Sequence, residues 1–397
     1  MRDTLFLSRY SLQALPWMFV LYGVVSALVS VAYGRFADKM PRHVGTAGTV
    51  AIGVTTYLLT WGLVRLKLPW IYPVFYVWSE VVANLLIVQF WTLANDLHDA
   101  RAAKRLFPLI GSARVLGVVV VGTSTGAIVR RIGTPQLLFV LAAMMVGLAA
   151  LAVSLRREPR TEPPAPRGPA PKVFGSPYVR VLAVLVLLTF TALTVGDYQF
   201  KAIARATYRE DALAQFFALF YAVTGIVSFL FQVFLTTRIL GRFGVGHAMA
   251  LMPLVFGAAS VTLLGAPILP VATVMKFADN GLQYTIHETS LQALYVPFPA
   301  RVKARTRALL DVAVKPLAYG VGGLVLVALA SRLAVHHLSF VTTGLVVVWL
   351  ALIPVARKLY QRTLSHTLSA LGPMAIEDEP YLCLLYTSPS PRDRTRS

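Results

Sequence analysis

Long apolar stretches separated by short polar segments dominate this chain. Each stretch is long enough to cross a hydrocarbon layer about 30 Å thick as a helix. Eleven such stretches are found, at residues 13–33, 45–64, 69–91, 107–129, 134–154, 177–196, 212–235, 244–266, 268–292, 306–330 and 338–356. Their length and close spacing exclude an ordinary soluble core. The pattern predicts an all-α, polytopic membrane protein with eleven transmembrane helices.

The polar segments alternate in their content of Lys and Arg. The basic ones carry Arg35, Lys39 and Arg42; Arg101, Lys104 and Arg105; Arg156, Arg157, Arg160, Arg167 and Lys172; Arg238 and Arg242; Arg301, Lys303, Arg305 and Arg307; and, in the tail, Arg357, Lys358 and Arg362. The positive-inside rule places them in the cytoplasm, which accounts for the net charge of +20 without nucleic acid as a partner. An odd helix count then places Met1 outside. Because the chain shows no signal peptide, we expect a first helix to be missing.

A polar, proline-rich segment divides the chain into two parts. Residues 155–176 read as a cytoplasmic basic linker between an N-terminal helical half, 1–154, and a C-terminal helical half, 177–360. Five apolar stretches precede it and six follow, which fits two six-helix halves with the first helix missing. Residues 361–382 are expected to form a cytoplasmic tail. The segment 383–397 resembles a translated sequencing adapter and contains the single cysteine.

The first basic loop carries a recognisable spacing. Gly34, Asp38, Lys39 and Arg42 match the Gly-x-x-x-Asp-Arg/Lys-x-x-Arg loop of the major facilitator superfamily, where it joins the second and third helices. We interpret it as a conformational gating loop and the chain as a major-facilitator-like bundle. A plain positive-inside loop explains the charges but not the spacing from glycine to aspartate.

Charged residues inside the apolar stretches are the candidate functional site, because such charges are costly in a membrane. Glu80 and Asn84 are four residues apart and share a helical face, and Arg114 lies in the following stretch. A structural ion pair between Arg114 and Glu80 is the alternative interpretation. Asp197 and Lys201 lie at the predicted outer end of the 177–196 helix. They form either an interfacial pair with a snorkelling lysine or a gate for an anionic ligand.

The second half carries a denser polar stripe. Spacings of three and four place Lys276, Asp279, Asn280, Gln283, His287 and Glu288 on one predicted helix, and Asp311 and Lys315 on the next. Lys276 with Asp279, and Asp311 with Lys315, are also the spacings of self-satisfied pairs within a helix. His287 is more often a residue that hydrogen-bonds between helices than a ligand. No second histidine or carboxylate cluster has the spacing of a metal site, so no metal or other cofactor is predicted.

Two longer motifs resemble the ATP/ADP translocase family of plastids and obligate intracellular bacteria, a divergent branch of the major facilitator superfamily. Residues 90–95 (FWTLAN) with 103–111 (AKRLFPLIG) resemble one family stretch, and residues 295–323, from Tyr295 to Gly323, resemble another. The resemblance covers most of residues 1–360 and implies nucleotide exchange. It also implies that Glu80, Asp197 and Lys201 handle substrate. The lysine of the family's first helix has no counterpart here, and Leu291 replaces a second lysine.

The substrate is expected to be a nucleotide or another anionic metabolite. A nucleoside triphosphate needs several Lys or Arg donors, and Arg114, Lys201, Lys276 and Lys315 are available. Phe90, Trp91 and Tyr284 are candidates for stacking a base. The chain shows no P-loop, which argues against ATP hydrolysis and against an enzyme. We expect a monomer in a bacterial inner membrane with a cytoplasmic C-terminus.

Two other functions remain open at this point. One is a proton-coupled transporter of a less charged solute, with Glu80, Asp279, His287 or Glu288 as proton carriers. The other is a membrane scaffold or receptor, which leaves the buried charges in both halves without a purpose.

Overall fold

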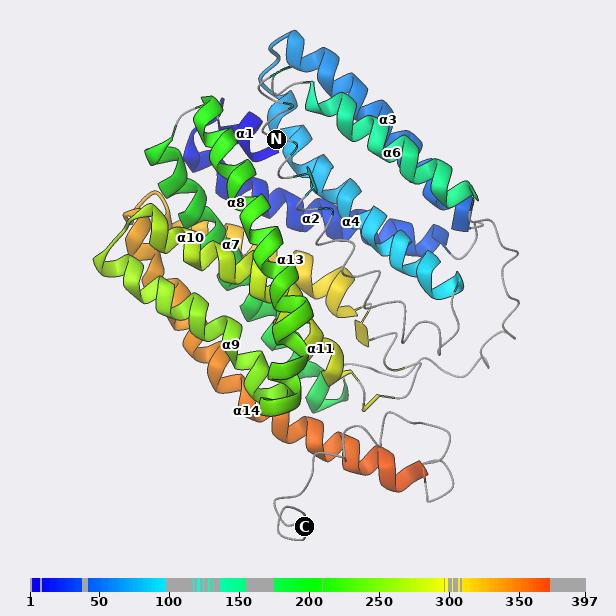
Figure 1. The fold of residues 1–397 in the computed structure, drawn as a ribbon, viewed down its shortest axis with the longest axis vertical. Helices are drawn as coiled ribbons and strands as arrows, with labels where there is room; N and C mark the ends of the chain where they lie inside the picture. Colours follow the sequence, from blue (N-terminus) through cyan, green and yellow to red (C-terminus); the bar gives the residue numbers. More distant parts are fainter. Residues whose placement is uncertain are drawn as a thin grey trace.

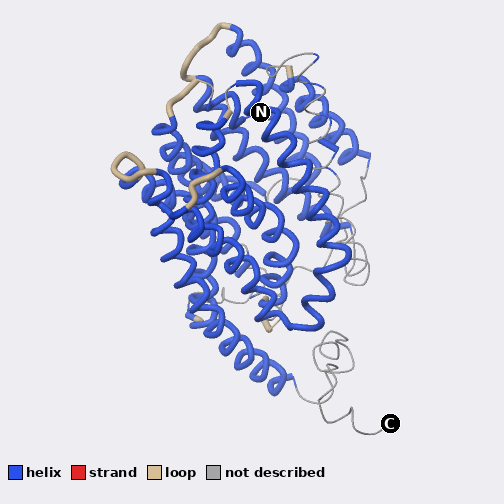
Figure 2. Tube along the Cα trace, turned by 60° about the vertical axis from the view of Figure 1, so that its left-hand side comes forward, coloured by secondary structure: helices blue, strands red, loops and turns tan. Residues whose placement is uncertain are grey.

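The computed structural model describes residues 2–7, 9–37, 42–97, 136–154, 175–208, 210–295 and 309–371, with isolated positions between 117 and 131 and between 297 and 307. Within this part of the chain the elements are helices joined by turns, without strands (Figure 2). The expected all-α fold is therefore confirmed.

The helices before residue 155, called here the first half, form one side of the bundle. They are α1 (Arg2–Leu7), η1 (Leu12–Ala14), α2 (Leu15–Ala37), α3 (Arg42–Arg65), α4 (Ile71–Leu97) and α6 (Leu137–Ser154). Helices α3 and α6 run side by side, and α4 contacts both α2 and α3 (Figure 1). The short helix α1 contacts α4 of its own half and α8 of the other. It is thus placed where the two halves meet.

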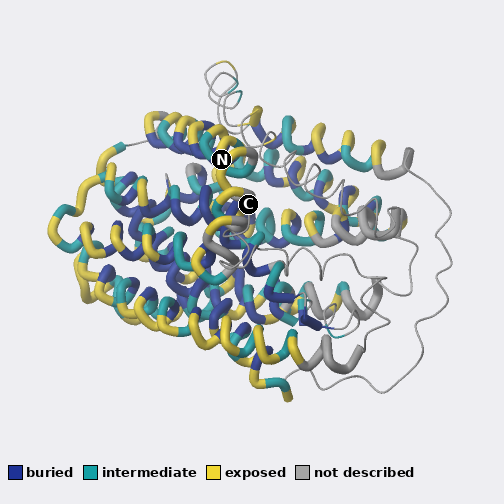
Figure 3. The backbone as a smooth tube through the Cα atoms, turned by 60° about the horizontal axis from the view of Figure 1, so that its bottom comes forward, coloured by how far each residue is buried: buried dark blue, intermediate teal, exposed yellow. Residues whose placement is uncertain are grey.

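The helices after residue 176 form the second half. They are α7 (Pro177–Thr207), α8 (Glu210–Leu230), η3 (Phe231–Thr236), α9 (Thr237–Gly265), α10 (Leu269–Phe277), η4 (Ala278–His287), α11 (Glu288–Leu294), η5 (Leu309–Val314), α13 (Lys315–Leu329), η6 (Val335–His337) and α14 (Leu338–Leu371). Helix α7 lies at the centre, in contact with α10, α13 and α14. Most of its side chains are buried, while the outward faces of the bundle are exposed (Figure 3).

Seven helical segments in the described residues are long and apolar enough to span a membrane. They are Leu12–Val29, Val44–Arg65, Pro177–Thr207, Ala212–Leu230, Gly246–Gly265, Leu309–Leu329 and Val335–Ser365, with shorter apolar helices at Ile71–Ile87 and Leu137–Leu151. Exposed Leu, Val, Ile and Phe side chains on the outer faces fit contact with lipid. Ten of the eleven predicted stretches therefore lie on described helices. Most of the stretch 107–129 lies outside the described residues.

Two predicted helix ends were too early. Helix α7 continues to Thr207 rather than ending at 196, and α14 continues to Leu371 rather than ending near 356–360. In both cases polar residues extend an apolar helix, since a helix satisfies its backbone hydrogen bonds internally whether or not its side chains lie in lipid. The expected tail from 361 thus begins as helix.

The helix that carries Lys276 is not a regular α-helix. Helix α10 passes into η4, a π-helix, in which the N–H of Glu288 donates to the carbonyl of Gln283 five residues earlier. Two further π-helical segments, η3 and η5, interrupt the neighbouring helices. Because π-segments occur often at functional sites, η4, which packs beside α8 and α9, is a candidate wall of such a site.

Helices α2 and α13 join the two halves at very close range. A Cβ placed on Gly23 would lie 2.7 Å from the carbonyl oxygen of Pro316 and 2.8 Å from the nitrogen of Gly320. A Cβ on Gly323 would lie 2.8 Å from the backbone nitrogen of Val20. Glycine at these positions lets the two backbones approach, as small residues do between membrane helices.

Candidate functional site

A cavity of about 220 Å³ lies at the junction of the two halves. Its walls come from α1, α2, α4, α7, α8, α10, η4 and α13. The lining residues are Arg2, Phe19, Tyr22, Tyr76, Glu80, Leu193, Thr194, Asp197, Lys201, Tyr221, Lys276, Asp279, Asn280, Gln283, Tyr284 and Tyr319. Glu80, Asp197, Lys201, Lys276, Asp279 and Gln283 were predicted from the sequence, and the structure brings them together.

Helix α7 places Asp197 and Lys201 on one face, four residues apart. The Lys201 ammonium lies 2.7 Å from the Asp197 carboxylate, and the lysine side chain is only 2% exposed. The helix continues past both residues, so they lie inside it rather than at its end. The interpretation of Lys201 as an interfacial, snorkelling lysine was therefore wrong.

Lys201 also contacts the first half of the chain. Its Nζ lies 2.9 Å from Oδ1 of Asp3 on α1, and it donates a hydrogen bond of 3.2 Å to the hydroxyl of Tyr76 on α4. Burial favours the neutral form of Asp3, but the positive charges of Arg2 and Lys201 outweigh burial and hold the pKa of this carboxyl well below its usual range. Lys201 is thus an ionic link between the two halves.

Lys276 binds two carboxylates of the second half. Its Nζ lies 2.5 Å from Oδ2 of Asp279, three residues along, and 2.6 Å from Oδ1 of Asp197 on α7. The predicted pair of Lys276 with Asp279 is confirmed, and Asp197 is a second ion-pair partner of the same lysine. The contact with Asp197 fixes α10 against α7.

Arg2 and Asp3 were not recognised in the sequence. The Arg2 guanidinium is paired with Glu80 and Asp3, and it lies 4.4 Å above the ring of Tyr76. Both residues precede the first apolar stretch, so no hydrophobic pattern marked them as buried. The glutamate that the sequence paired with Arg114 is bound to Arg2, whereas Arg114 lies outside the described residues.

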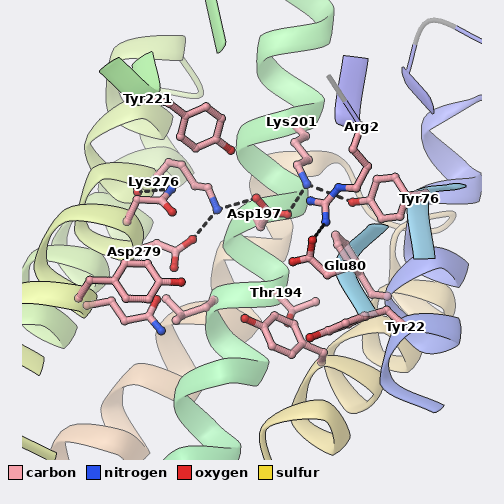
Figure 4. A pocket seen from close by; sticks show the side chains of 16 residues that line it. Arg2, Tyr22, Tyr76, Glu80, Thr194, Asp197, Lys201, Tyr221, Lys276 and Asp279 are labelled. Carbon is pink, nitrogen blue, oxygen red and sulfur yellow. Dashed lines mark hydrogen bonds and ion pairs between the residues drawn. The ribbon is translucent and has the colours of Figure 1, made fainter. Parts of the chain in front are cut away.

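The ion pairs join into a continuous chain across the cavity, and Figure 4 shows all of its members except Asp3. In order, it runs through Glu80, Arg2, Asp3, Lys201, Asp197, Lys276 and Asp279. Charges of opposite sign alternate along it, so each of its cations lies between two carboxylates. This arrangement supplies the partners that buried charges require. We call it the charge chain.

Some predicted residues lie beside the cavity, and others are not among the described residues. Asn84 does not line the cavity, but its Nδ2 donates a hydrogen bond of 2.7 Å to the hydroxyl of Tyr22, which does. Gly34 and Arg42 lie near the ends of α2 and α3, while Asp38 and Lys39 fall outside the described residues. The gating loop thus stays a prediction. Of the aromatic candidates, Tyr284 lines the cavity and Phe90 does not.

The other predicted charges form a second, separate cluster. Lys315 lies 2.7 Å from Asp311 and 3.8 Å from Glu288, and Arg307 lies 3.6 Å from Asp311. The predicted pairing of Asp311 with Lys315 is therefore confirmed. His287 is buried, with its ring edge-on to Trp349 at 5.4 Å. These residues do not line the described cavity.

The described helices form an all-helical, polytopic membrane protein with a major-facilitator-like fold. The nucleoside transporter NupG has a similar structure, with a TM-score of 0.56 at 14% identity over 92% of both chains, and a variant of it matches at 0.59. Residues 16–150 match the model of the TLC ATP/ADP transporter family.

Relatives of known family match the chain at low identity. The plastidic ATP/ADP-transporter of Solanum tuberosum is 23% identical over 360 residues, covering 77% of this chain and 53% of that protein. ADP,ATP carrier protein 1 of Chlamydia trachomatis is 24% identical over 302 residues, covering 63% and 57%. The chain spans about half the length of the plastid relatives it matches. The chain is distantly homologous to these ATP/ADP transporters, and the resemblance seen in the sequence motifs is confirmed.

Proposed function

We propose that this chain is a secondary transporter that exchanges nucleotides of the ATP/ADP type by alternating access. The observation that carries the proposal is the position of Lys201, which contacts α1 and α4 of the first half and Asp197 of the second. Transport by alternating access requires the two halves to move about a central site. Such movement must break or exchange the contacts of Lys201 with Asp3 and Tyr76 of the first half.

The charge chain offers the donors that phosphate groups need. Arg2, Lys201 and Lys276 all line the cavity, and each is already held by carboxylates. Phosphate oxygens form the same charge-assisted hydrogen bonds to Lys and Arg as carboxylates do. A nucleotide therefore binds by replacing carboxylates as partners of these cations. The carboxylates act as internal substitutes for phosphate while the site is empty.

This substitution gives a physical reason for exchange rather than one-way transport. Without a nucleotide, separating the halves removes Asp3 from Lys201 and leaves buried charges unpaired, which is strongly unfavourable. With a nucleotide bound, a phosphate oxygen takes the place of Asp3, and the halves separate at lower cost. The loaded protein then reorients faster than the empty one, which is the requirement for coupled exchange.

The remaining features of the proposal follow from the family and from the charge pattern. The related proteins are carriers of bacteria and plastids. We place this chain in a bacterial inner membrane as a monomer, with the linker 155–176 and the C-terminus in the cytoplasm, where the Lys and Arg loops belong. The two halves that move are 1–154 and 177–360, with Gly34, Asp38, Lys39 and Arg42 as their gating loop. The partners are the lipid bilayer and a small anionic substrate.

A second candidate function is supported by the balance of charges. The charge chain contains four carboxylates, Asp3, Glu80, Asp197 and Asp279, but three cations, Arg2, Lys201 and Lys276. An excess carboxylate is a candidate proton carrier for transport of a less charged solute. Glu80 is the best placed, because its side chain is 44% exposed toward the cavity.

Reconstitution in liposomes separates the two functions. Labelled ATP uptake is measured with and without ADP inside, and again after a protonophore collapses any pH gradient. We expect uptake to require internal ADP and to be unaffected by the protonophore. Uptake of another solute that depends on the proton gradient, in protein that does not take up ATP, would contradict the proposal and support the second function.

A further inference from the structure

One part of the cavity is lined by charged side chains and another by aromatic ones. The contact between Lys276 and Asp197 shows that these two positions of α10 and α7 lie side by side. From this contact α7 runs back through Thr194 to Phe190, while η4 runs forward through Gln283 to Tyr284. The path along α7 leads away from Lys201, and the path along η4 passes Asp279 before it reaches Gln283 and Tyr284. The cavity residues beyond Asp197 and Asp279 on these two paths are outside the charge chain, and we call them the second level.

Three tyrosines mark this second level. The ring of Tyr319 lies 5.5 Å from that of Phe190 on α7, and the ring of Tyr22 meets Tyr319 edge-on at 5.3 Å. Tyr284 lines the same cavity and is 41% exposed. Phe190 is seven residues from Asp197, which corresponds to about 10 Å along a helix. We call Tyr22, Tyr284 and Tyr319 the aromatic level.

Polar side chains hold the walls of this level in place. Asn84 donates to the hydroxyl of Tyr22, and the amide of Gln283, in the orientation that satisfies its neighbours, donates to Oδ1 of Asp279 at 2.9 Å. In Figure 4, Tyr22 and Thr194 lie on the side of the cavity away from Lys201 and Arg2. The lining cations, Arg2, Lys201 and Lys276, all belong to the charge chain. The two levels thus differ in chemistry as well as in position.

We propose that the aromatic level holds the base of the nucleotide while the charge chain holds its phosphates. This inference rests on the proposed function and adds to it the orientation of the substrate. Aromatic side chains stack on any base, since every base has a π face, whereas phosphates require cations. The ribose then lies between the two levels, beside Thr194. Tyr284, the most accessible of the three rings, is the stacking partner, and Tyr22 and Tyr319 form the opposite wall.

The orientation defines the class of ligand and predicts a preference within it. A polyphosphate without a base fills only the charge chain, and a nucleoside fills only the aromatic level. Purine nucleotides should bind more tightly than pyrimidine nucleotides, because the larger ring system stacks over more of the tyrosine surface.

Competition binding on the full chain in lipid nanodiscs tests the inference. Labelled ATP is displaced by ATP, adenosine or tripolyphosphate in the wild type, Tyr284→Ala, Tyr284→Phe and Tyr208→Ala. Tyr208, at the end of α7, does not line the described cavity and serves as the matched control. We expect Tyr284→Ala to weaken ATP and adenosine about tenfold or more and to leave tripolyphosphate unchanged. Tyr284→Phe should resemble the wild type, and Tyr208→Ala should leave adenosine unchanged.

The outcomes distinguish this inference from the proposed function. If Tyr284→Ala leaves ATP binding intact, or weakens tripolyphosphate as much as ATP, the inference is wrong while nucleotide binding stands. If the wild type does not bind ATP at all, the proposed function and the inference fall together. Should Tyr284→Ala not fold, as judged by thermal unfolding, Tyr284→Leu keeps the volume of the side chain without the ring and gives the same comparison.

Discussion

The ammonium of Lys201 lies 2.9 Å from the carboxylate of Asp3, and this single contact joins α7 of the second half to α1 of the first. Lys201 is nearly inaccessible, with 2% of its side chain exposed. In the exchange mechanism proposed above, this contact couples the occupancy of the site to the movement of the two halves.

The variant Asp3→Asn should make ATP uptake less dependent on ADP inside the liposome. A hydrogen bond to a charged group contributes about 1.5–3 kcal/mol, so its loss should accelerate reorientation of the empty protein roughly 10- to 150-fold. The ratio of ATP uptake with internal ADP to uptake without it should then fall toward one. Tyr221→Phe, which removes a lining hydroxyl within the second half, is the control and should keep the ratio of the wild type. An unchanged ratio in Asp3→Asn would show that this link does not restrain the empty protein.

Lys276→Gln should destabilise the protein. Asp279 loses its ion-pair partner and Asp197 loses one of two, and removing one member of a buried pair costs about 3–5 kcal/mol. The double variant Lys276→Gln with Asp279→Asn should recover part of this loss, because one uncompensated carboxylate is then neutral. Denaturant unfolding in detergent measures both. Equal stability of the single and double variants would contradict the assigned pairing.

Gly23→Ala should disturb the contact between α2 and α13. The added Cβ meets backbone atoms of Pro316 and Gly320 at less than 3 Å, and neither can move without shifting the helix. We expect a loss of about 1–3 kcal/mol in the free energy of unfolding. Gly62→Ala on α3 is the matched control, since nothing lies within 4 Å of its Cβ. It should be neutral or stabilising by up to about 1 kcal/mol.

The variant Lys315→Gln tests whether the second charged cluster takes part in substrate binding. Because Lys315 does not line the described cavity, the dissociation constant for ATP should stay within about twofold of the wild type, while the free energy of unfolding falls. Binding and unfolding are measured on the same preparation. A tenfold loss of affinity at unchanged stability would instead assign Lys315 to the binding site, as the sequence suggested.

The pH dependence of exchange follows from Asp3. A carboxyl with a depressed pKa contributes stability above its unfolded pKa, near 3.9, and loses that contribution as the pH falls through the lower folded value. The link to Lys201 should therefore persist from about pH 8 down to about pH 5. The requirement for internal ADP should be constant over this range when uptake is measured without a pH gradient. Loss of the requirement near pH 6 would assign the link to a different group.

Much of the architecture follows from the sequence alone. Apolar stretches of sufficient length predicted the helices, because a chain in lipid must satisfy its backbone hydrogen bonds within each segment. Buried charges in those stretches identified Glu80, Asp197, Lys201, Lys276 and Asp279, because charge in an apolar helix is too costly to be incidental. Helical spacing added the neutral Gln283 to this set. Intrahelical spacing also predicted the pairs of Lys276 with Asp279 and of Asp311 with Lys315.

The tertiary structure decided which of these groups act together. Arg2 and Asp3 precede the apolar pattern, so only the docking of α1 against α4 and α8 reveals that they complete the charge chain. Within the π-helix η4, Gln283 and Tyr284 line the cavity and His287 does not, although a regular helical period places His287 on the same face as Gln283. Periodicity along a chain records which face of a helix is buried. Which residues from different helices share a cavity depends on the crossing and register of those helices, and these are set by packing between distant segments.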